Sequence, residues 1–355
     1  MSTLKVGIVG LPNVGKSTLF NILTKKGIPA ENYPFCTIDP NVGIVKVEDP
    51  RLESLEKIEN PEEVIPAVVE FVDIAGLVKG AHKGEGLGNQ FLSHIREVSI
   101  IVHVVRGFID ENVTHVSEKI DPISDIETIE YELILKDIET MEGMIEKQAK
   151  SARSDDKEKT WLELLENLKK HLEEERKAID FDWVEDFAQK RRGLALLTDK
   201  KMIYLINTDS KLDFDLEKYL IGKSYVVSNL KVEEELFNLN EDERKGYRQE
   251  LGLELTSLEK LVKLAYDKLG LITFFTVGPM EVRAWTTKKG ATIREAAGVI
   301  HTDFGKNFIA ADVVPYSDFT SSQGWEGAKK IGKVRLEGRD YIVQDGDIVI
   351  VKHGA

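Results

Sequence analysis

The chain has 355 residues, 42% of them apolar, with 48 basic and 62 acidic side chains and a formal net charge of −14. This length and apolar content suffice for two or three packed domains, while the longest apolar runs fall short of the roughly 18 to 20 residues that a membrane span requires. We expect a cytoplasmic protein, since there is no signal-peptide pattern and Cys36 is the only cysteine. The net acidity argues against generic nucleic-acid coating, although a local basic patch is still compatible with it. Neither a membrane nor a specific DNA partner is expected.

The first predicted elements are a strand, a glycine-bearing loop and a helix. Leu4 to Val9 is a short β-branched run, turn residues follow from Leu11 to Gly15, and helix-forming residues resume at Ser17. Three further apolar runs have the length of strands and are bounded by charged or glycine-bearing segments: Phe71–Ile74, Ile100–Val105 and Met202–Ile206. Such runs are typical of buried strands in a mostly parallel sheet, so the predicted fold class is α/β.

Apolar residues at helical spacing predict two long helices before the Met202–Ile206 strand. One stripe runs from Ile126 to Ile145, the polar segment 150–159 follows, and a second stripe runs from Trp161 to Leu172. We interpret the pair as an antiparallel helical hairpin inserted into the α/β domain. A solvated coiled coil and a partner-binding arm both remain compatible with this pattern.

The last part of the chain changes character. From Leu271 onward, short β-type runs alternate with turn-rich stretches, which predicts a separate small α+β domain. We therefore draw four segments: the two parts of the α/β domain at 1–125 and 199–271, the helical insertion at 126–198, and the C-terminal domain at 272–355.

One motif in the first loop carries a specific chemistry. Gly10-Leu-Pro-Asn-Val-Gly15-Lys16-Ser17 matches the phosphate-binding pattern G-x-x-x-x-G-K-[ST] and stands between a predicted strand and a predicted helix. Glycines let backbone N–H groups point at phosphate oxygens, and the positive N-terminus of the helix faces the same anion. The predicted nucleotide contacts are Asn13, Val14, Gly15, Lys16, Ser17 and Thr18, with Lys16 also neutralising charge during catalysis.

Two further segments fit a magnesium-bound triphosphate. Asp73-Ile-Ala-Gly76 follows a predicted strand, where Asp73 can hold a metal-bound water and Gly76 can offer its N–H to the γ-phosphate. Thr37 lies between two prolines, where its hydroxyl can complete the coordination shell of Mg²⁺ when a γ-phosphate is present. The predicted Mg²⁺ ligands are Ser17, Thr37 and Asp73, since Mg²⁺ prefers oxygen. A simple turn is the alternative for each of the last two segments.

The sequence has no glutamine at the position that orients the attacking water in small GTPases. Leu77 stands where small GTPases have a glutamine, and leucine has no polar group for that task. The glycine-rich segment Gly80 to Gly88 is expected to order over the nucleotide. Candidate polar groups are His82, His103 and His115, although a structural or merely exposed role is the default for each histidine.

The predicted base-recognition segment departs from that of a GTPase. Guanine is usually read by N-K-x-D, whereas the strand that ends near Ile206 is followed by Asn207-Thr208-Asp209-Ser210. Ser210 lacks the carboxylate for two-point contact with guanine, although Asp209 could replace it if rotated into the pocket. Adenine is therefore favoured, with Asn207 and Thr208 as predicted contacts.

Long motifs throughout the chain resemble one known family, the YchF/Obg-like ATPases of the translation-factor-related P-loop class. The matching stretches are Gly7–Asn21, Tyr33–Pro40, Phe71–Gly80, Lys83–Leu92, Glu281–Trp285, Ile300–Phe304 and Asp340–Asp347. The resemblance implies a G domain at 1–125 and 199–271, a coiled-coil insertion at 126–198 and a TGS domain at 272–355. It further implies ribosome association, with the large subunit or ribosomal RNA as the expected contact.

The same resemblance implies specific site properties. Family members prefer ATP over GTP and usually have N-x-x-E where this chain has Asn207 to Ser210. They place a functional histidine in a stretch similar to the one around His115, so His115 is the first choice for positioning the attacking water and His82 the second. Asn13 is similar to the asparagine with which potassium-dependent relatives hold K⁺.

The resulting functional prediction is slow, Mg²⁺-dependent ATP hydrolysis coupled to a ribosome-associated switch. One alternative is a GTP-binding switch, and another is an RNA- or ribosome-binding module in which hydrolysis is incidental. For the latter, the C-terminal domain offers aromatic and cationic residues suited to RNA: Arg283, Trp285, Lys288, Lys289, Arg294 and Lys306. A small-molecule kinase is disfavoured because no acceptor pocket is identifiable.

Overall fold

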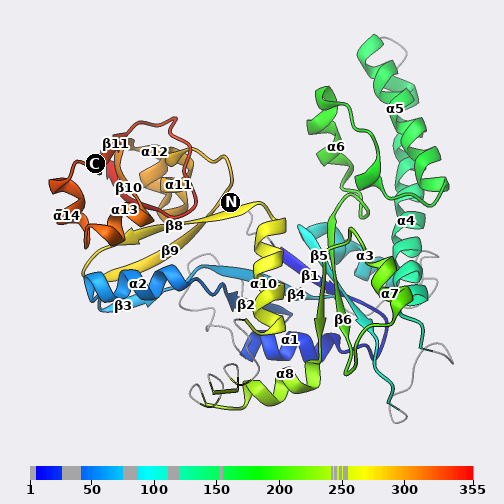
Figure 1. Cartoon of the computed structure of the whole chain (residues 1–355). Coiled ribbons are helices and arrows are strands. Elements are labelled where there is room, and N and C mark those ends of the chain that lie inside the picture. Colours follow the sequence, from blue (N-terminus) through cyan, green and yellow to red (C-terminus); the bar gives the residue numbers. More distant parts are fainter. Residues whose placement is uncertain are drawn as a thin grey trace. The chain divides into compact units, whose positions relative to one another are not determined.

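The computed structural model describes residues 5–25, 41–74, 87–110, 120–151, 155–240, 243, 246–247, 250 and 255–354. The chain divides into two compact units (Figure 1). The first contains residues 1–26, 30–43 and 70–258, and the second contains residues 27–29, 44–69 and 259–355. None of the helices in the described ranges has the length and apolarity needed to cross a bilayer.

A six-stranded sheet with the order β2-β4-β1-β5-β6-β7 forms the centre of the first unit. Its strands are β1 (Lys5–Val9), β2 (Val42–Lys46), β4 (Val68–Asp73), β5 (Ile100–Arg106), β6 (Lys201–Asn207) and β7 (Tyr225–Ser228). β1 pairs in parallel with β4 and β5, and β5, β6 and β7 continue in parallel. All seven residues of β5 are buried, as a strand covered on both faces requires. The predicted mostly parallel sheet is confirmed.

Helices cover both faces of this sheet. α1 (Lys16–Lys25) and α8 (Leu230–Phe237) pack together, and α4 (Pro122–Ser151) packs against β5 and α7 (Phe214–Tyr219) (Figure 1). α3 (Leu87–Glu97) contacts β1. The alternation of side chains along β5 and β6 places Val105 and Ile206 in the cluster with α4 and α7.

The predicted helical hairpin is present. α4 and α5 (Asp156–Glu173) run side by side (Figure 1), and a buried cluster that includes Trp161, Leu165 and Leu168 holds them together. Three short helices follow: η3 (Ala178–Asp180), η4 (Glu185–Phe187) and α6 (Ala188–Leu194). The second stripe and the C-terminal part of the first therefore form the buried seam between the two helices, whereas Ile126 at the start of the first stripe packs with β5 and β6.

Two carboxylates of α4, the buried Asp137 and the partly buried Glu130, fix the base of the hairpin. Asp137 accepts hydrogen bonds from the Leu197 and Thr198 amides, both at 2.8 Å, and from the Thr198 hydroxyl at 2.6 Å. Glu130 accepts from the Tyr204 hydroxyl of β6 and pairs with Lys177 at 3.1 Å. α4 is thus tied both to the segment that returns to the sheet and to the sheet itself.

A second six-stranded sheet, in the order β11-β10-β12-β8-β9-β3, forms the second unit. Its strands are β3 (Glu63–Ile65), β8 (Leu271–Val277), β9 (Glu281–Lys288), β10 (Phe308–Pro315), β11 (Arg335–Glu337) and β12 (Asp347–His353). Its helices are α2 (Pro50–Glu59), α10 (Ser257–Lys268), α11 (Ile293–Ile300), α12 (Thr302–Lys306), α13 (Tyr316–Ser321) and α14 (Trp325–Lys330). The first two residues of α10 are assigned to the first unit, and the rest of the helix, from Glu259, to the second. The predicted C-terminal α+β domain corresponds to most of this unit.

Opposite faces of this sheet are covered by different helices. Phe274 belongs to the cluster that packs beneath α11 with Ile293 and Ala297. The next residue, Phe275, points to the other face, where the Arg51 guanidinium of α2 lies 5.1 Å from its ring centre.

The placement of residues 44–69 was not predicted. This segment follows β2 in the sequence, yet α2 and β3 belong to the second unit. β3 pairs in parallel with β9, and Arg51 bonds Asp345 at 2.7 Å. The four segment boundaries drawn from the sequence, which place residues 44–69 in the α/β domain, remain a prediction.

Candidate functional site

The candidate site lies where parallel strands of the first sheet end together. β1 leads into the loop 10–15, Asp73 is the last residue of β4, Gly107 follows β5, and Asn207 is the last residue of β6. The carboxyl edge of an open parallel sheet is the usual position for a ligand. Residues predicted from separate parts of the sequence are thereby brought to one edge.

The phosphate loop has a backbone that requires glycine. Gly15 has φ +106°, and a Cβ there would lie 2.7 Å from the Asn207 amide nitrogen. A Cβ on Gly10 would lie 2.5 Å from the Val104 carbonyl oxygen. Asn13, at φ 61°, also adopts the left-handed region. The loop is therefore closely packed against β5 and β6, and α1 starts directly behind it at Lys16.

Lys16 and Asp73 form the charged part of the site. The Lys16 ammonium donates to the Leu11 carbonyl at 2.7 Å, so it lies across the loop. Burial lowers the pKa of Lys16 and raises the pKa of Asp73, and the attraction between the two charges opposes both shifts. A half-buried cation and carboxylate at a helix N-terminus provide the polarity that a metal-bound polyphosphate needs.

The residues present fit a magnesium ion. Asp73 Oδ1 is buried and accepts no hydrogen bond from any described residue, which is costly unless a ligand uses this oxygen. Ser17 is exposed in the first turn of α1 and offers a second oxygen. A carboxylate and a hydroxyl are hard donors of the kind that Mg²⁺ takes along with several waters. Thr37, the third predicted ligand, lies outside the described residues.

Asn207 connects three segments of the site. Its amide nitrogen donates to the Val14 carbonyl at 3.0 Å, and its oxygen accepts from the Leu230 amide at 3.2 Å. The buried side chain therefore joins the end of β6 to the phosphate loop and to the start of α8. Both ends of the amide are used in this connection, while direct contact with a base stays a prediction.

The residues after Asn207 form a small hydroxyl cluster. The buried Thr208 hydroxyl lies 3.1 Å from the Gly107 carbonyl and 3.3 Å from the Ser210 hydroxyl, and it accepts from the Ser210 amide at 3.2 Å. The Thr208 amide donates to Ser228 at 2.9 Å. Thr208 therefore shapes the turn, and Ser210 and Asp209 are exposed beyond it.

Of the three candidate histidines, only His103 lies in the part of the chain that the structure describes. His103 lies on β5 with 1% of its surface exposed, and neither ring nitrogen has a hydrogen-bond partner within the part of the chain that the structure describes. Burial lowers its pKa to about 4, so the ring is neutral, and it lies in the core away from solvent. His82, His115 and Gly76 lie outside the described residues, and their predicted roles stay predictions.

Arg106 is a feature of this edge that the sequence analysis did not single out. It is almost fully buried, donates to the Phe108 and Asp110 carbonyls at 3.2 Å, and lies 4.5 Å from the centre of the Phe108 ring. These bonds fix the turn after β5, next to Gly107 and Thr208. A buried arginine at the end of a strand is not distinguishable in sequence from an exposed one.

Comparison with known proteins identifies the family. Residues 5–137 match the family described as "50S ribosome-binding GTPase", and residues 271–354 match the YchF-GTPase C-terminal family, described as a protein of unknown function. The "Ribosome-binding ATPase YchF" of Bacillus subtilis is 49% identical over 98% of this chain and 98% of its own length. The chain belongs to the YchF/Obg-like ATPase family.

More distant members of the YchF/Obg-like ATPase family are also similar over nearly the whole chain. "Obg-like ATPase 1" of Pongo abelii is 44% identical over 99% of this chain and 92% of its own. The structure of the Schizosaccharomyces pombe YchF GTPase superposes with a TM-score of 0.90 at 36% identity, covering 99% and 98% of the two chains. Both units thus have the fold of this family, and the first contains its P-loop nucleotide-binding domain.

Proposed function

We propose that this protein is a Mg²⁺-dependent ATPase that hydrolyses the β–γ phosphoanhydride slowly and acts as a nucleotide-dependent, ribosome-associated switch in the cytoplasm. The observation that carries the proposal is the convergence at one sheet edge of the phosphate loop, Lys16 and a buried Asp73 oxygen that no described residue hydrogen-bonds. The names of the relatives, ribosome-binding ATPase and Obg-like ATPase, support ATP and the ribosome as partners.

The residues of the site have different parts in the proposed reaction. The loop amides and the N-terminus of α1 bind the phosphates, and Lys16 moves from the Leu11 carbonyl to neutralise charge on the transferring phosphoryl group. Ser17, Thr37 and Asp73 are proposed to hold Mg²⁺, directly or through water. The ion, when bound, withdraws charge from the phosphate oxygens. His115, with His82 second, is proposed to orient the attacking water.

Slow turnover follows from what the site offers. Leu77 cannot orient a water, and among the described residues the buried Arg106 is fully engaged with the turn after β5. A glutamine and an arginine finger account for much of the rate in fast GTPases. We therefore expect a partner to accelerate hydrolysis, and the ribosome, through its large subunit or its RNA, is the proposed candidate.

ATP is proposed to bind more tightly than GTP because the base-recognition turn lacks the guanine-reading carboxylate. Ser210 stands at that position, with its amide and hydroxyl close to Thr208. A GTP-binding switch is the second candidate, and the exposed Asp209 is the observation that favours it. K⁺ held at Asn13 is a further proposal, tested by comparing turnover in KCl and NaCl.

The decisive experiment measures equilibrium binding of non-hydrolysable ATP and GTP analogues with Mg²⁺. Wild type should prefer ATP, Lys16→Ala should lose both nucleotides, and Ser210→Asp should gain affinity for GTP. Ser210→Ala is the matched control, since it adds no carboxylate. Normal ATP affinity in Lys16→Ala would refute the site, whereas equal or tighter GTP binding by wild type would make the protein a GTP switch.

A further inference from the structure

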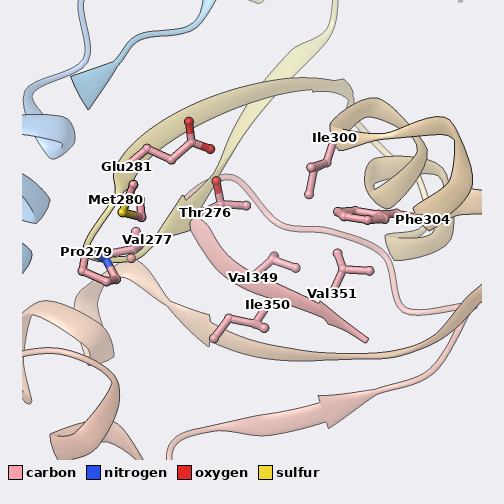
Figure 2. A pocket seen from close by; sticks show the side chains of 11 residues that line it. Thr276, Val277, Pro279, Met280, Glu281, Ile300, Phe304, Val349, Ile350 and Val351 are labelled. Carbon is pink, nitrogen blue, oxygen red and sulfur yellow. The ribbon is translucent and has the colours of Figure 1, made fainter. Parts of the chain in front are cut away.

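The second unit carries an open apolar pocket that nucleotide chemistry does not use. It has a volume of about 310 Å³ and is formed by the end of β8, the β8–β9 turn, helices α11 and α12, and β12. Figure 2 shows Ile300 and Phe304 of the helices on one side and Val349 and Val351 of β12 beneath them, with Met280 at the other end.

The pocket lies where two neighbouring strands of seven residues each are staggered along the sheet. β8 and β12 are parallel, with Ile348 opposite Phe275, and β8 ends at Val277. β12 runs on to His353 and stays paired with β10. The final residues of β12 therefore extend past the end of β8, and Val349, Ile350 and Val351 of β12 line the pocket.

An acidic rim adjoins this pocket. Met280 and Glu281 line the apolar pocket and also a neighbouring one, whose other lining residues are Glu62 and Glu63. Glu63 and Glu281 are direct partners in the parallel β3–β9 pair, and like charges in such positions repel. The ion pair between Arg283 and Glu281 is long at 4.0 Å. Three carboxylates thus remain close together around the exposed Met280 side chain.

We propose that this surface binds a basic, extended segment of a protein, with one apolar side chain in the pocket and lysine or arginine side chains against Glu62, Glu63 and Glu281. Opposite charge would relieve the repulsion between the carboxylates, whereas the phosphates of a nucleic acid would add to it. The segment would lie beside the part of β12 that extends past β8. This inference goes beyond the proposed function and does not depend on hydrolysis.

The exposed methionine supplies a direct reporter. Met280 is 65% exposed and is one of five methionines, so ¹³C-methyl labelling of the full chain gives five NMR signals. The probe is a nine-residue synthetic peptide with a central leucine flanked by lysines. We expect a saturable shift of the Met280 methyl signal, while the buried Met141 signal stays in place.

Variants separate charge from apolar contact. Replacing Glu62, Glu63 and Glu281 together by glutamine should weaken binding about tenfold, because three exposed ion pairs at about 0.5 kcal/mol each are lost. Replacing the peptide's leucine by serine should weaken it about tenfold as well. Glu326→Gln, which removes an exposed carboxylate elsewhere in the unit, should leave it unchanged.

Several outcomes would overturn the proposal. One is that the peptide does not shift the Met280 signal, and another is that the triple glutamine variant binds the peptide as tightly as wild type does. A third is that an oligouridylate of similar length, and not the peptide, shifts the signal. ATP-analogue binding is measured on the same samples. Because nucleotide affinity should be the same in all these variants, failure of the peptide site and failure of the proposed function give different results.

Discussion

At the scale of single residues, burial moves two pKa values of the first unit in opposite directions. Burial lowers the pKa of His103 to about 4, with Glu130 opposing the shift. Burial raises the pKa of Asp137 to about 6, against the hydrogen bonds from Thr198 and Leu197. Both groups therefore change charge within the same acidic range, and their effects on stability oppose each other.

His103→Phe should make the protein less sensitive to acid. Between pH 6.5 and 4 the unfolded chain binds a proton at this histidine and the folded chain does not, so folding stability falls as the pH falls. The unfolding free energy of the variant minus that of wild type should rise by about 3 kcal/mol as the pH falls from 7.5 to 4, because the variant has no imidazole to protonate. Urea unfolding at several pH values measures it, and a pH-independent difference would contradict a buried neutral ring.

Asp137→Asn should have the opposite pH dependence. The folded carboxyl holds a proton between about pH 6 and 4 where the unfolded one does not, so this group favours the fold more as the pH falls. The variant should therefore lose about 2 kcal/mol relative to wild type between pH 7 and 4, in addition to a pH-independent cost for its altered hydrogen bonds. Asp156→Asn, at an exposed position of α5, is the matched control for replacing a carboxylate of the hairpin.

At the scale of elements, Asn207 makes β6, the phosphate loop and α8 act together. Asn207→Ala removes the bonds to Val14 and Leu230, each about 1 kcal/mol, and frees the loop. We expect nucleotide affinity to fall about tenfold or more, as measured by calorimetry.

Asn229→Ala is the matched control for Asn207→Ala. Asn229 caps α8 by accepting from the Lys231 and Val232 amides, so its loss should lower stability by about 1 kcal/mol. Nucleotide affinity should stay the same because the bonds of Asn207 are intact. Equal loss of affinity in both variants would mean that α8 as a whole, and not the link to the loop, controls binding.

Strong local patterns made most elements of the first unit predictable. The phosphate loop, the buried strands and the helical hairpin each carry a motif or a period that does not depend on distant residues. β3 was not predictable because it has three residues and is ordered by pairing with β9, far along the chain. The role of Asn207 likewise depends on Val14 and Leu230, which only the fold brings to it. The histidine that would position water stays a prediction.

At the scale of the whole molecule, Arg51 is central to how the second unit is held together. It bonds Asp49, the N-cap of α2, and Asp345, which in turn accepts from the Thr273 amide of β8. Its guanidinium also lies over the Phe275 ring. The N-terminal segment 44–69 is thereby fastened to the C-terminal strands.

Arg51→Ala should loosen this unit. The loss of charge-assisted bonds and of the cation–π contact should cost about 2 kcal/mol. Hydrogen–deuterium exchange should speed up in α2, β3 and β9, whereas Lys57→Ala, at an exposed position of α2, should leave exchange unchanged. Faster exchange confined to α2 would show that β3 holds its place without this anchor.

The path of the chain through its two units has a consequence for how this protein can evolve. Because residues 44–69 complete the sheet that begins at Leu271, a crossover between genes near residue 270 would separate α2 and β3 from the strands they cover. The hybrid would place Arg51 against a foreign surface, and β9 would keep β8 but lose its matched β3 neighbour. Residues 44–69 and the C-terminal strands are therefore expected to be exchanged together, as one folding unit.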